Sequence, residues 1–357
     1  MKNRKNVGIL TFHYSVNNFG AVIQSLAVSR LIESFGFNPI IINYRPKILG
    51  FFPNLIYFIN YILGYNFQKF RSIHLKCLTN KIKSDEDFIK LNSSIDVFTV
   101  GSDQVWRYRN DYSVLSKYYL DFVSLEKKKI AIAVSFGKDI WDGPLTHVNK
   151  LKKLVKEFDF ISVREESGIR IVEELFDSKA TRILDPTLLV DKSIYYNLIK
   201  SSNLDINVPF LSFMLLDYNY ESELNVKSFA KKNFLQFIHI KGFRLAKNPD
   251  FWIYNRIEDW LNYLSKSSLV ITDSFHCVVF CLIFKVPFIC LINDNRGNSR
   301  LFNLLGICKL EHRVVSSLDL KTIDKIYTEK IDYDSVWHSL DVEISKSKTL
   351  LSENLSL

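Results

Sequence analysis

The stretch Ser268–Leu291 (SLVITDSFHCVVFCLIFKVPFICL) constrains the fold of this chain more than any other. A short apolar run, Leu269–Ile271, stops at three polar residues, and a helix-length apolar segment, Phe275–Phe284, precedes another apolar run, Phe288–Ile292. Short continuous apolar runs are typical of parallel strands buried on both faces, so the pattern predicts a strand–helix–strand unit. His276 then falls in the first helical turn after a strand, where open parallel sheets bind ligands and helix N-termini attract anions.

The same alternation opens the chain. Val7–Phe12 is a strand pattern, Ala21–Phe35 has the alternating apolar and polar faces of a helix, and Pro39–Asn43 is a second strand pattern. Strand and helix patterns continue through both halves, and 357 residues are enough for about two domains. The sequence therefore predicts an α/β protein with two Rossmann-like halves that face one cleft.

Polar side chains follow the predicted strands where each strand stops. Because the carboxyl ends of parallel strands meet at one edge of a sheet, we expect these residues to share the cleft. Arg164 is unfavourable at the start of a helix, so it either pairs with a carboxylate such as Glu165 or holds a ligand anion. The candidate site residues are Asn18, Gly20, Ser102, Asp103, Gln104, Arg164, Ser274, His276 and Arg300.

Charge and cysteine usage restrict the partners. Lys and Arg number 47 against 38 Asp and Glu, and the net charge of +9 suits an acidic substrate or an anionic membrane surface. We expect no nucleic-acid partner, because no nucleic-acid module is present. Five cysteines in apolar surroundings favour reduced thiols and a cytoplasmic protein. We expect neither a metal nor a cofactor, since no second ligand pair has zinc spacing and no GxGxxG fingerprint occurs.

The segment Ile48–Gly64 (ILGFFPNLIYFINYILG) is the most hydrophobic stretch outside the predicted cores. It is shorter than the ~20 residues that a membrane span needs. One interpretation is a helix or lid packed on its own domain. The other is a helix in the membrane interface, because Lys69, Arg71 and Lys76 follow it.

Six segments in order resemble the polysaccharide pyruvyl transferase family, from residue 7 to about 310: NNFGAVIQSLA, VGSDQVW, FISVREESG, LDPTLL, VITDSFHCVVFCLIFKVPF and NSRLFNLLGI. The resemblance implies a GT-B-like pair of Rossmann-like domains. Residues 1–190 would form the N-terminal domain on the acceptor side, and residues 205–330 the C-terminal domain with the donor site. Residues 331–357 would form a C-terminal helix that packs back on the first domain.

The resemblance also implies an activity. Members of the family transfer the pyruvyl group of phosphoenolpyruvate to two hydroxyls of a sugar as a ketal, in exopolysaccharide or cell-surface glycan synthesis. The sugar acceptor would be free or part of a lipid-linked oligosaccharide, which fits peripheral contact with the inner face of a membrane. By resemblance, His276, Arg164 and Arg300 match the family residues that hold the carboxylate and phosphate of the donor.

The residue types fit this chemistry independently. Phosphoenolpyruvate is a small dianion whose site needs fixed cations or helix N-termini. Ketal formation needs a proton for the methylene carbon and a base for the attacking hydroxyl. His276 and Asp103 are our candidates for proton transfer. Asp273 is an alternative that would serve equally well as a helix cap.

Two other functions remain open. A GT-B glycosyltransferase with a nucleotide-sugar donor would need a carboxylate for the ribose, and the second half offers no strong candidate. A non-catalytic paralogue that binds glycan would be expected to lose the basic residues, and all three are present. Fold alone does not distinguish these functions.

Overall fold

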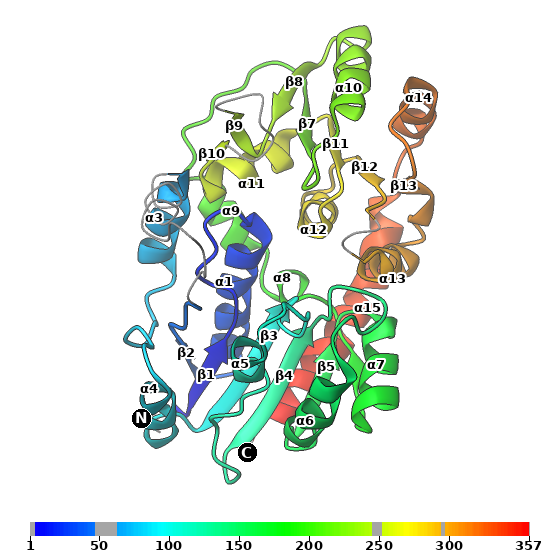
Figure 1. Ribbon diagram of the computed structural model, residues 1–357. Coiled ribbons are helices and arrows are strands. Elements are labelled where there is room, and N and C mark those ends of the chain that lie inside the picture. Colours follow the sequence, from blue (N-terminus) through cyan, green and yellow to red (C-terminus); the bar gives the residue numbers. More distant parts are fainter. Residues whose placement is uncertain (1–3, 47–62, 245–251, 294–296, 357) are drawn as a thin grey trace.

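Two parallel sheets covered by helices on both faces make up the computed structural model (Figure 1). The structure describes residues 4–46, 63–244, 252–293 and 297–356. Each sheet with its helices is a Rossmann-like unit, so the predicted α/β fold with two such domains is confirmed.

The N-terminal sheet has six strands in the order β2-β1-β3-β4-β5-β6. Its strands are β1 (Asn6–Leu10), β2 (Asn38–Ile41), β3 (Val97–Asp103), β4 (Lys128–Val134), β5 (Phe160–Val163) and β6 (Thr181–Arg182). All neighbouring strands pair in parallel, and β3 is buried along its whole length. Continuous apolar sequence forms such strands because helices cover both faces of the sheet.

Different helices cover the two faces of this sheet. One face packs against α1 (Phe19–Ser34), α8 (Pro186–Leu189) and α15 (Tyr333–Leu355). The other face packs against α5 (Tyr112–Lys117), α6 (Leu145–Val155) and α7 (Glu166–Phe176). Shorter helices at the periphery are α3 (Tyr65–His74), α4 (Asp85–Lys90), the 3-10 turn Leu91–Ser93 and α9 (Ser193–Ile199).

The C-terminal sheet has five parallel strands in the order β13-β12-β11-β7-β8. They are β7 (Phe210–Met214), β8 (Gln236–His239), β11 (Leu269–Thr272), β12 (Phe288–Leu291) and β13 (Val314–Val315). Its helices are α10 (Tyr220–Lys232), α11 (Ile257–Lys266), α12 (Phe275–Phe284), α13 (Ser299–Cys308) and α14 (Leu320–Thr328). A 3-10 turn, Glu311–Arg313, and an antiparallel pair, β9 (Gly242–Arg244) with β10 (Trp252–Tyr254), complete the domain.

The unit β11–α12–β12 forms as the sequence predicts. Helix α12 spans the predicted residues, with Ser274 as its N-cap and Lys285 in a left-handed conformation at its C-terminal end. Nearly every side chain of α12 is buried, because the helix lies between its own sheet and the N-terminal domain. This burial explains why the segment is apolar on all sides.

An apolar contact and the last helix join the two domains. The ring of Phe19 at the start of α1 stacks on Trp260 of α11, with ring centroids 5.1 Å apart. Helix α15 then runs from the C-terminal domain back to the N-terminal domain, as Figure 1 shows in red. Its Trp337 donates to the carbonyl of Leu282 on α12, and its Ser347 accepts from the amide of Leu184.

The hydrophobic segment Ile48–Gly64 lies almost entirely outside the described residues, so the choice between a packed helix and an interfacial helix stays a prediction. None of the described helices combines the length and hydropathy needed to cross a membrane.

Candidate active site

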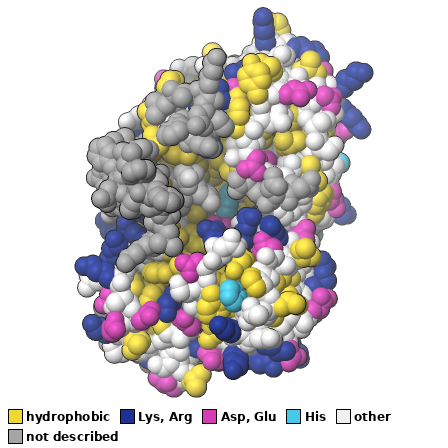
Figure 2. Space-filling model, in the orientation of Figure 1, with side chains coloured by type: hydrophobic (Ala, Val, Ile, Leu, Met, Phe, Trp, Pro, Cys, Tyr) yellow, Lys and Arg dark blue, Asp and Glu magenta, His cyan; other side chains and the backbone are white. Residues whose placement is uncertain are grey.

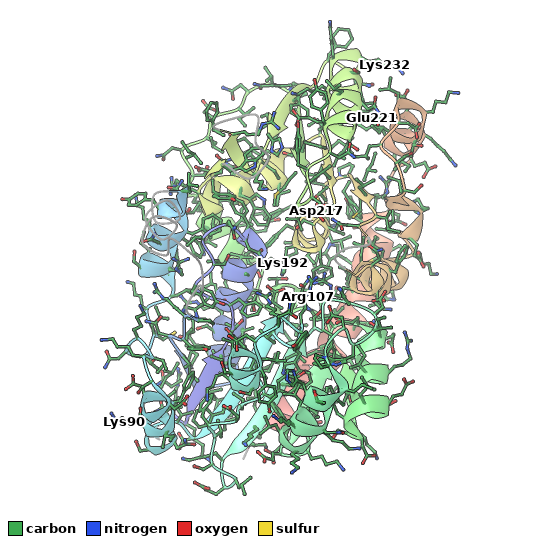
Figure 3. All side chains as sticks on the ribbon, in the orientation of Figure 1. Lys90, Arg107, Lys192, Asp217, Glu221 and Lys232 are labelled. Atoms are coloured by element: carbon green, nitrogen blue, oxygen red, sulfur yellow. The ribbon has the colours of Figure 1, made fainter. Side chains whose placement is uncertain are left out.

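A pocket of about 170 Å³ lies between the two sheets at the carboxyl ends of their strands. Figure 2 shows Lys and Arg side chains gathered at the hollow between the two halves. In Figure 3, Arg107 lies on the N-terminal side of this region and Asp217 on the C-terminal side. Six of the nine predicted residues line the pocket: Asn18, Asp103, Gln104, Ser274, His276 and Arg300.

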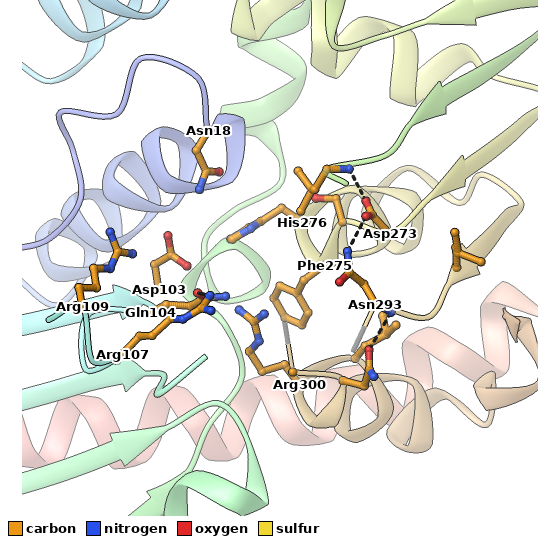
Figure 4. Close-up of a pocket in the computed structure, with 16 residues that line it drawn as sticks. Asn18, Asp103, Gln104, Arg107, Arg109, Asp273, Phe275, His276, Asn293 and Arg300 are labelled. Carbon is orange, nitrogen blue, oxygen red and sulfur yellow. Dashed lines mark hydrogen bonds between the residues drawn. The ribbon is translucent and has the colours of Figure 1, made fainter. Parts of the chain in front are cut away.

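Asp103 ends β3 and places its carboxylate in the pocket (Figure 4). Its φ of 83° lies in the left-handed region, which a non-glycine residue adopts at a cost and which is common at functional sites. Burial raises the pKa of Asp103, but Arg164, His276 and Arg300 outweigh it and leave the pKa below its usual value. Asp103 is therefore ionised at neutral pH.

Arg164 does not line this pocket, which differs from the expectation that it holds a ligand anion. It is almost completely buried, and its guanidinium donates to Asp185 Oδ2 at 2.6 Å and to Asp103 Oδ1 at 3.2 Å. Arg164 therefore pairs with carboxylates, which is the other predicted role. Its partners are Asp185 and Asp103 rather than Glu165. Arg164 thus supports the floor of the pocket and fixes Asp103.

Ser102 is also a supporting residue rather than a pocket contact. Its side chain is fully buried, and its hydroxyl donates to the carbonyl of Ala133 and to Asp185 Oδ2. Its amide donates to the side chain of Gln24 on α1. No atom of Ser102 remains for a ligand, so the predicted substrate contact is corrected.

His276 extends from the first turn of α12 into the wall of the N-terminal domain. Its Nε2 lies 3.7 Å from Asp185 Oδ2. Burial lowers the pKa of His276, with Asp185 and Asp103 opposing the effect and Arg164 and Arg300 adding to it. The free protein therefore holds a neutral imidazole at this position.

Gly20 contacts this imidazole instead of a ligand, which corrects its predicted role. A Cβ at Gly20 would lie 2.1 Å from His276 Nδ1, far inside van der Waals contact. Only glycine leaves room for the ring, and the neighbouring Asn18 caps α1 by accepting from the amide of Ala21. The space beside Gly20 is therefore occupied by a side chain of the other domain.

Asp273 is neither the helix cap nor free for proton transfer. Its carboxylate accepts from the amides of Leu216 and Asp217 after β7 and from the side chain of Asn293 after β12. These bonds tie three strand ends together at the wall of the pocket, which Asp273 itself lines. Ser274 is the N-cap of α12 and lines the pocket together with Phe275 and His276, so the N-terminus of this helix, whose first amides have no partner within the helix, lies at the pocket.

Arginines line the rest of the pocket. Arg300, in the first turn of α13, lies with its guanidinium 5.8 Å from the ring of Phe275, and burial together with Arg164 lowers its pKa to about 10. It therefore stays protonated at neutral pH. Arg109 lines the pocket from the N-terminal domain, and its guanidinium lies 4.5 Å from the centroid of the Phe12 ring.

Sequence reasoning missed several residues of this region, among them Arg109. Arg107 lines the pocket and donates to Gln104, and Asn293 lines it beside Asp273. Asp185 lies beneath it, where it pairs with Arg164 and lies 3.7 Å from His276 Nε2. Arg107 follows a predicted strand end by only a few residues, which was a usable signal. Asp185 was visible as a polar strand end, but no local pattern links it to His276.

The arrangement suits a small anion and proton transfer. Helix N-termini and arginines supply positive potential, while a neutral histidine from one domain and an ionised aspartate from the other line the same pocket (Figure 4). Among the described residues there is no group of three or more His, Cys, Asp or Glu side chains that could hold a metal ion.

Two Rossmann-like domains with a pocket between them define the GT-B-like class of α/β proteins. Solved structures with a similar fold support this assignment. A glycosyltransferase from Rickettsia africae is 12% identical over 99% of both chains, with a TM-score of 0.56. A UDP-N-acetylglucosamine 2-epimerase from Rickettsia bellii is 12% identical over 98% of this chain and 95% of its own, with a TM-score of 0.57. At such low identity these similarities establish the fold alone.

The family is identified from sequence. The family model of polysaccharide pyruvyl transferases matches residues 18–295, which is most of the chain, and the chain therefore belongs to this family of transferases. No curated protein sequence gives a significant match.

Proposed function

We propose that the protein transfers the pyruvyl group of phosphoenolpyruvate to two hydroxyls of a sugar as a ketal and releases phosphate. One observation carries the proposal: the N-terminus of α12, His276 and Arg300 converge on one pocket in a chain of the pyruvyl transferase family. Phosphoenolpyruvate carries a carboxylate and a phosphate on a small frame, so it matches a compact site with several positive groups.

The proton balance of the reaction assigns roles to His276 and Asp103. Two C–O bonds form at C2 of the donor, the C2–O bond to phosphate breaks, and the methylene carbon gains a proton. Each sugar hydroxyl loses a proton, one of which ends on the methylene carbon and the other on the departing phosphate. Neutral His276 carries both protons, while ionised Asp103 accepts a hydrogen bond from the acceptor and orients it.

The direct test is incubation with phosphoenolpyruvate and candidate lipid-linked saccharides. We expect release of inorganic phosphate together with a mass gain of one pyruvate ketal on the saccharide. Release of phosphate without a modified saccharide would contradict the transfer. Consumption of a nucleotide sugar instead of phosphoenolpyruvate would favour a GT-B glycosyltransferase.

Donor binding should stabilise the protein, because any ligand that binds only the native state does so. Phosphoenolpyruvate at 100 times its Kd would add ~2.7 kcal/mol to the free energy of unfolding. Arg300→Ala should lose most of this gain, since hydrogen bonds to charged groups contribute ~1.5–3 kcal/mol. Thermal denaturation with and without the donor measures the effect. Arg30→Ala, which removes an exposed arginine of α1, is the control. An undiminished donor effect in Arg300→Ala would exclude this residue from the donor site.

We also propose peripheral contact with an anionic membrane, on the basis of the net charge of +9 and the segment Ile48–Gly64. The protein should bind vesicles that contain anionic lipid and should dissociate as salt increases, because exposed charges are screened. Co-sedimentation at low and high salt measures the binding. Equal and negligible binding to anionic and neutral vesicles at low salt would favour a helix packed on its own domain.

A further inference from the structure

Asp185 and His276 come from different domains, yet they face each other beneath the pocket. Asp185 is the N-cap of α8 and has no exposed side-chain surface, whereas His276 belongs to α12. His276 Nε2 is shielded from solvent, and no hydrogen-bond partner for it exists within the described residues. Its neighbour at 3.7 Å is Asp185 Oδ2, which is within ion-pair distance but too far for a hydrogen bond.

The carboxylate of Asp185 is held in one orientation. Its Oδ1 accepts from the amide and the hydroxyl of Thr187, while Oδ2 accepts from Arg164 at 2.6 Å and from Ser102 at 3.3 Å. Burial alone would raise the pKa of Asp185, but Arg164 and His276 outweigh it, and the pKa is about 2. An anion of fixed orientation therefore faces the buried nitrogen of the imidazole.

We propose that Asp185 is a positioning residue that keeps the proton of neutral His276 on Nε2 and leaves Nδ1 as the base that exchanges protons with substrate. The inference deepens the proposed function and rests on it. A carboxylate that accepts from one ring nitrogen fixes the tautomer and stabilises the imidazolium that forms in turnover. Gly20 completes the arrangement, because a side chain there would occupy the space beside Nδ1.

The arrangement joins the catalytic histidine of one domain to an anchor in the other. A distance of 3.7 Å before substrate binds is compatible with this role, since catalytic hydrogen bonds often shorten only in the complex. Four charged groups act on the imidazole: Asp103 after β3, Arg164 after β5, Asp185 at α8 and Arg300 on α13. Of these, Asp185 is the one within ion-pair distance of a ring nitrogen.

The wild-type protein tests the tautomer directly. Ring nitrogen shifts in two-bond proton–nitrogen NMR spectra distinguish the two neutral forms, and the signal absent from His276→Gln identifies His276 among the seven histidines. We expect a proton on Nε2 at a pH where the ring is neutral. A proton on Nδ1 would overturn the proposal. This measurement needs neither donor nor acceptor, so its result is independent of the proposed function.

The variant Asp185→Asn tests the consequence for turnover. We expect kcat to fall ~10²-fold or more, with thermal stabilisation by phosphoenolpyruvate retained. The acidic limb of the pH–rate profile should move to lower pH, because loss of the anion lowers the pKa of His276 further. Asp319→Asn, which removes the charge of the N-cap of α14 while the asparagine can still cap the helix, is the control and should keep the wild-type profile. A folded Asp185→Asn protein with an unshifted profile and an unchanged tautomer would overturn the proposal. If the variant does not fold, the wild-type tautomer alone decides.

Discussion

His276→Gln is expected to lower kcat by about 10²–10⁴-fold, the loss typical of a missing acid–base group, while much of the donor affinity remains. Glutamine can still donate a hydrogen bond to the donor phosphate but cannot accept and return a proton at neutral pH. The free protein holds His276 neutral, chiefly because it is buried, and a bound phosphate favours the imidazolium. In the proposed reaction, donor binding would therefore load the proton that the later steps use.

Steady-state kinetics at saturating acceptor separates two roles of this histidine. A fall in kcat with a nearly constant donor KM indicates proton transfer. A raised KM with intact kcat is the pattern of lost uniform binding and would leave His276 as an anion clamp only. His338→Gln, at an exposed position of α15, controls for the substitution itself.

Gly20→Ala should be almost as damaging as the loss of His276, although it adds only one methyl group. The new Cβ would meet the imidazole at 2.1 Å from Nδ1, and the ring is buried between two domains. The ring has to move by about 1 Å or more, and a misplacement of that size can cost ~10²-fold in rate. We expect kcat to fall at least ~10²-fold, with weakened contact between α1 and α12.

Gly306→Ala is the matched control for this substitution. Gly306 lies within α13, where the nearest atom to an added Cβ is a side-chain oxygen of Glu311 at 3.4 Å. Alanine is the better helix former by ~1 kcal/mol, so this variant should keep full activity and unfold at a slightly higher temperature. Full activity of Gly20→Ala would show that the imidazole position is not critical.

The fold was predictable because buried strands and helices have a recognisable pattern of apolar residues in the local sequence. Helix α12 was predicted with the observed ends, and β11 within one residue, since a strand and a helix buried on all sides must be apolar throughout. That His276 lies just after a strand end followed from the same pattern. The position of a residue within a strand or helix depends on its neighbours in sequence, so the local pattern was enough to place His276.

The partners of the site residues were much harder to predict. The carboxylates that hold Arg164 lie 61 and 21 residues away in sequence, whereas the obvious neighbour Glu165 accepts from Ser135 instead. Gly20 faces a histidine 256 positions further along the chain. The Arg164 contacts join strand ends within one domain, and the contact of Gly20 with His276 forms where the two domains meet. Neither kind of contact leaves a signal in the local sequence.

Helix α15 limits how the two domains can move relative to each other at the pocket. It is one helix of 23 residues, about 35 Å long, with Trp337 fastened to α12 and Ser347 fastened to the strand end at Leu184. A rigid rod anchored at both ends resists the two domains sliding or twisting past each other. We therefore expect the two domains to separate at the pocket only if this helix bends or one of its two attachments breaks.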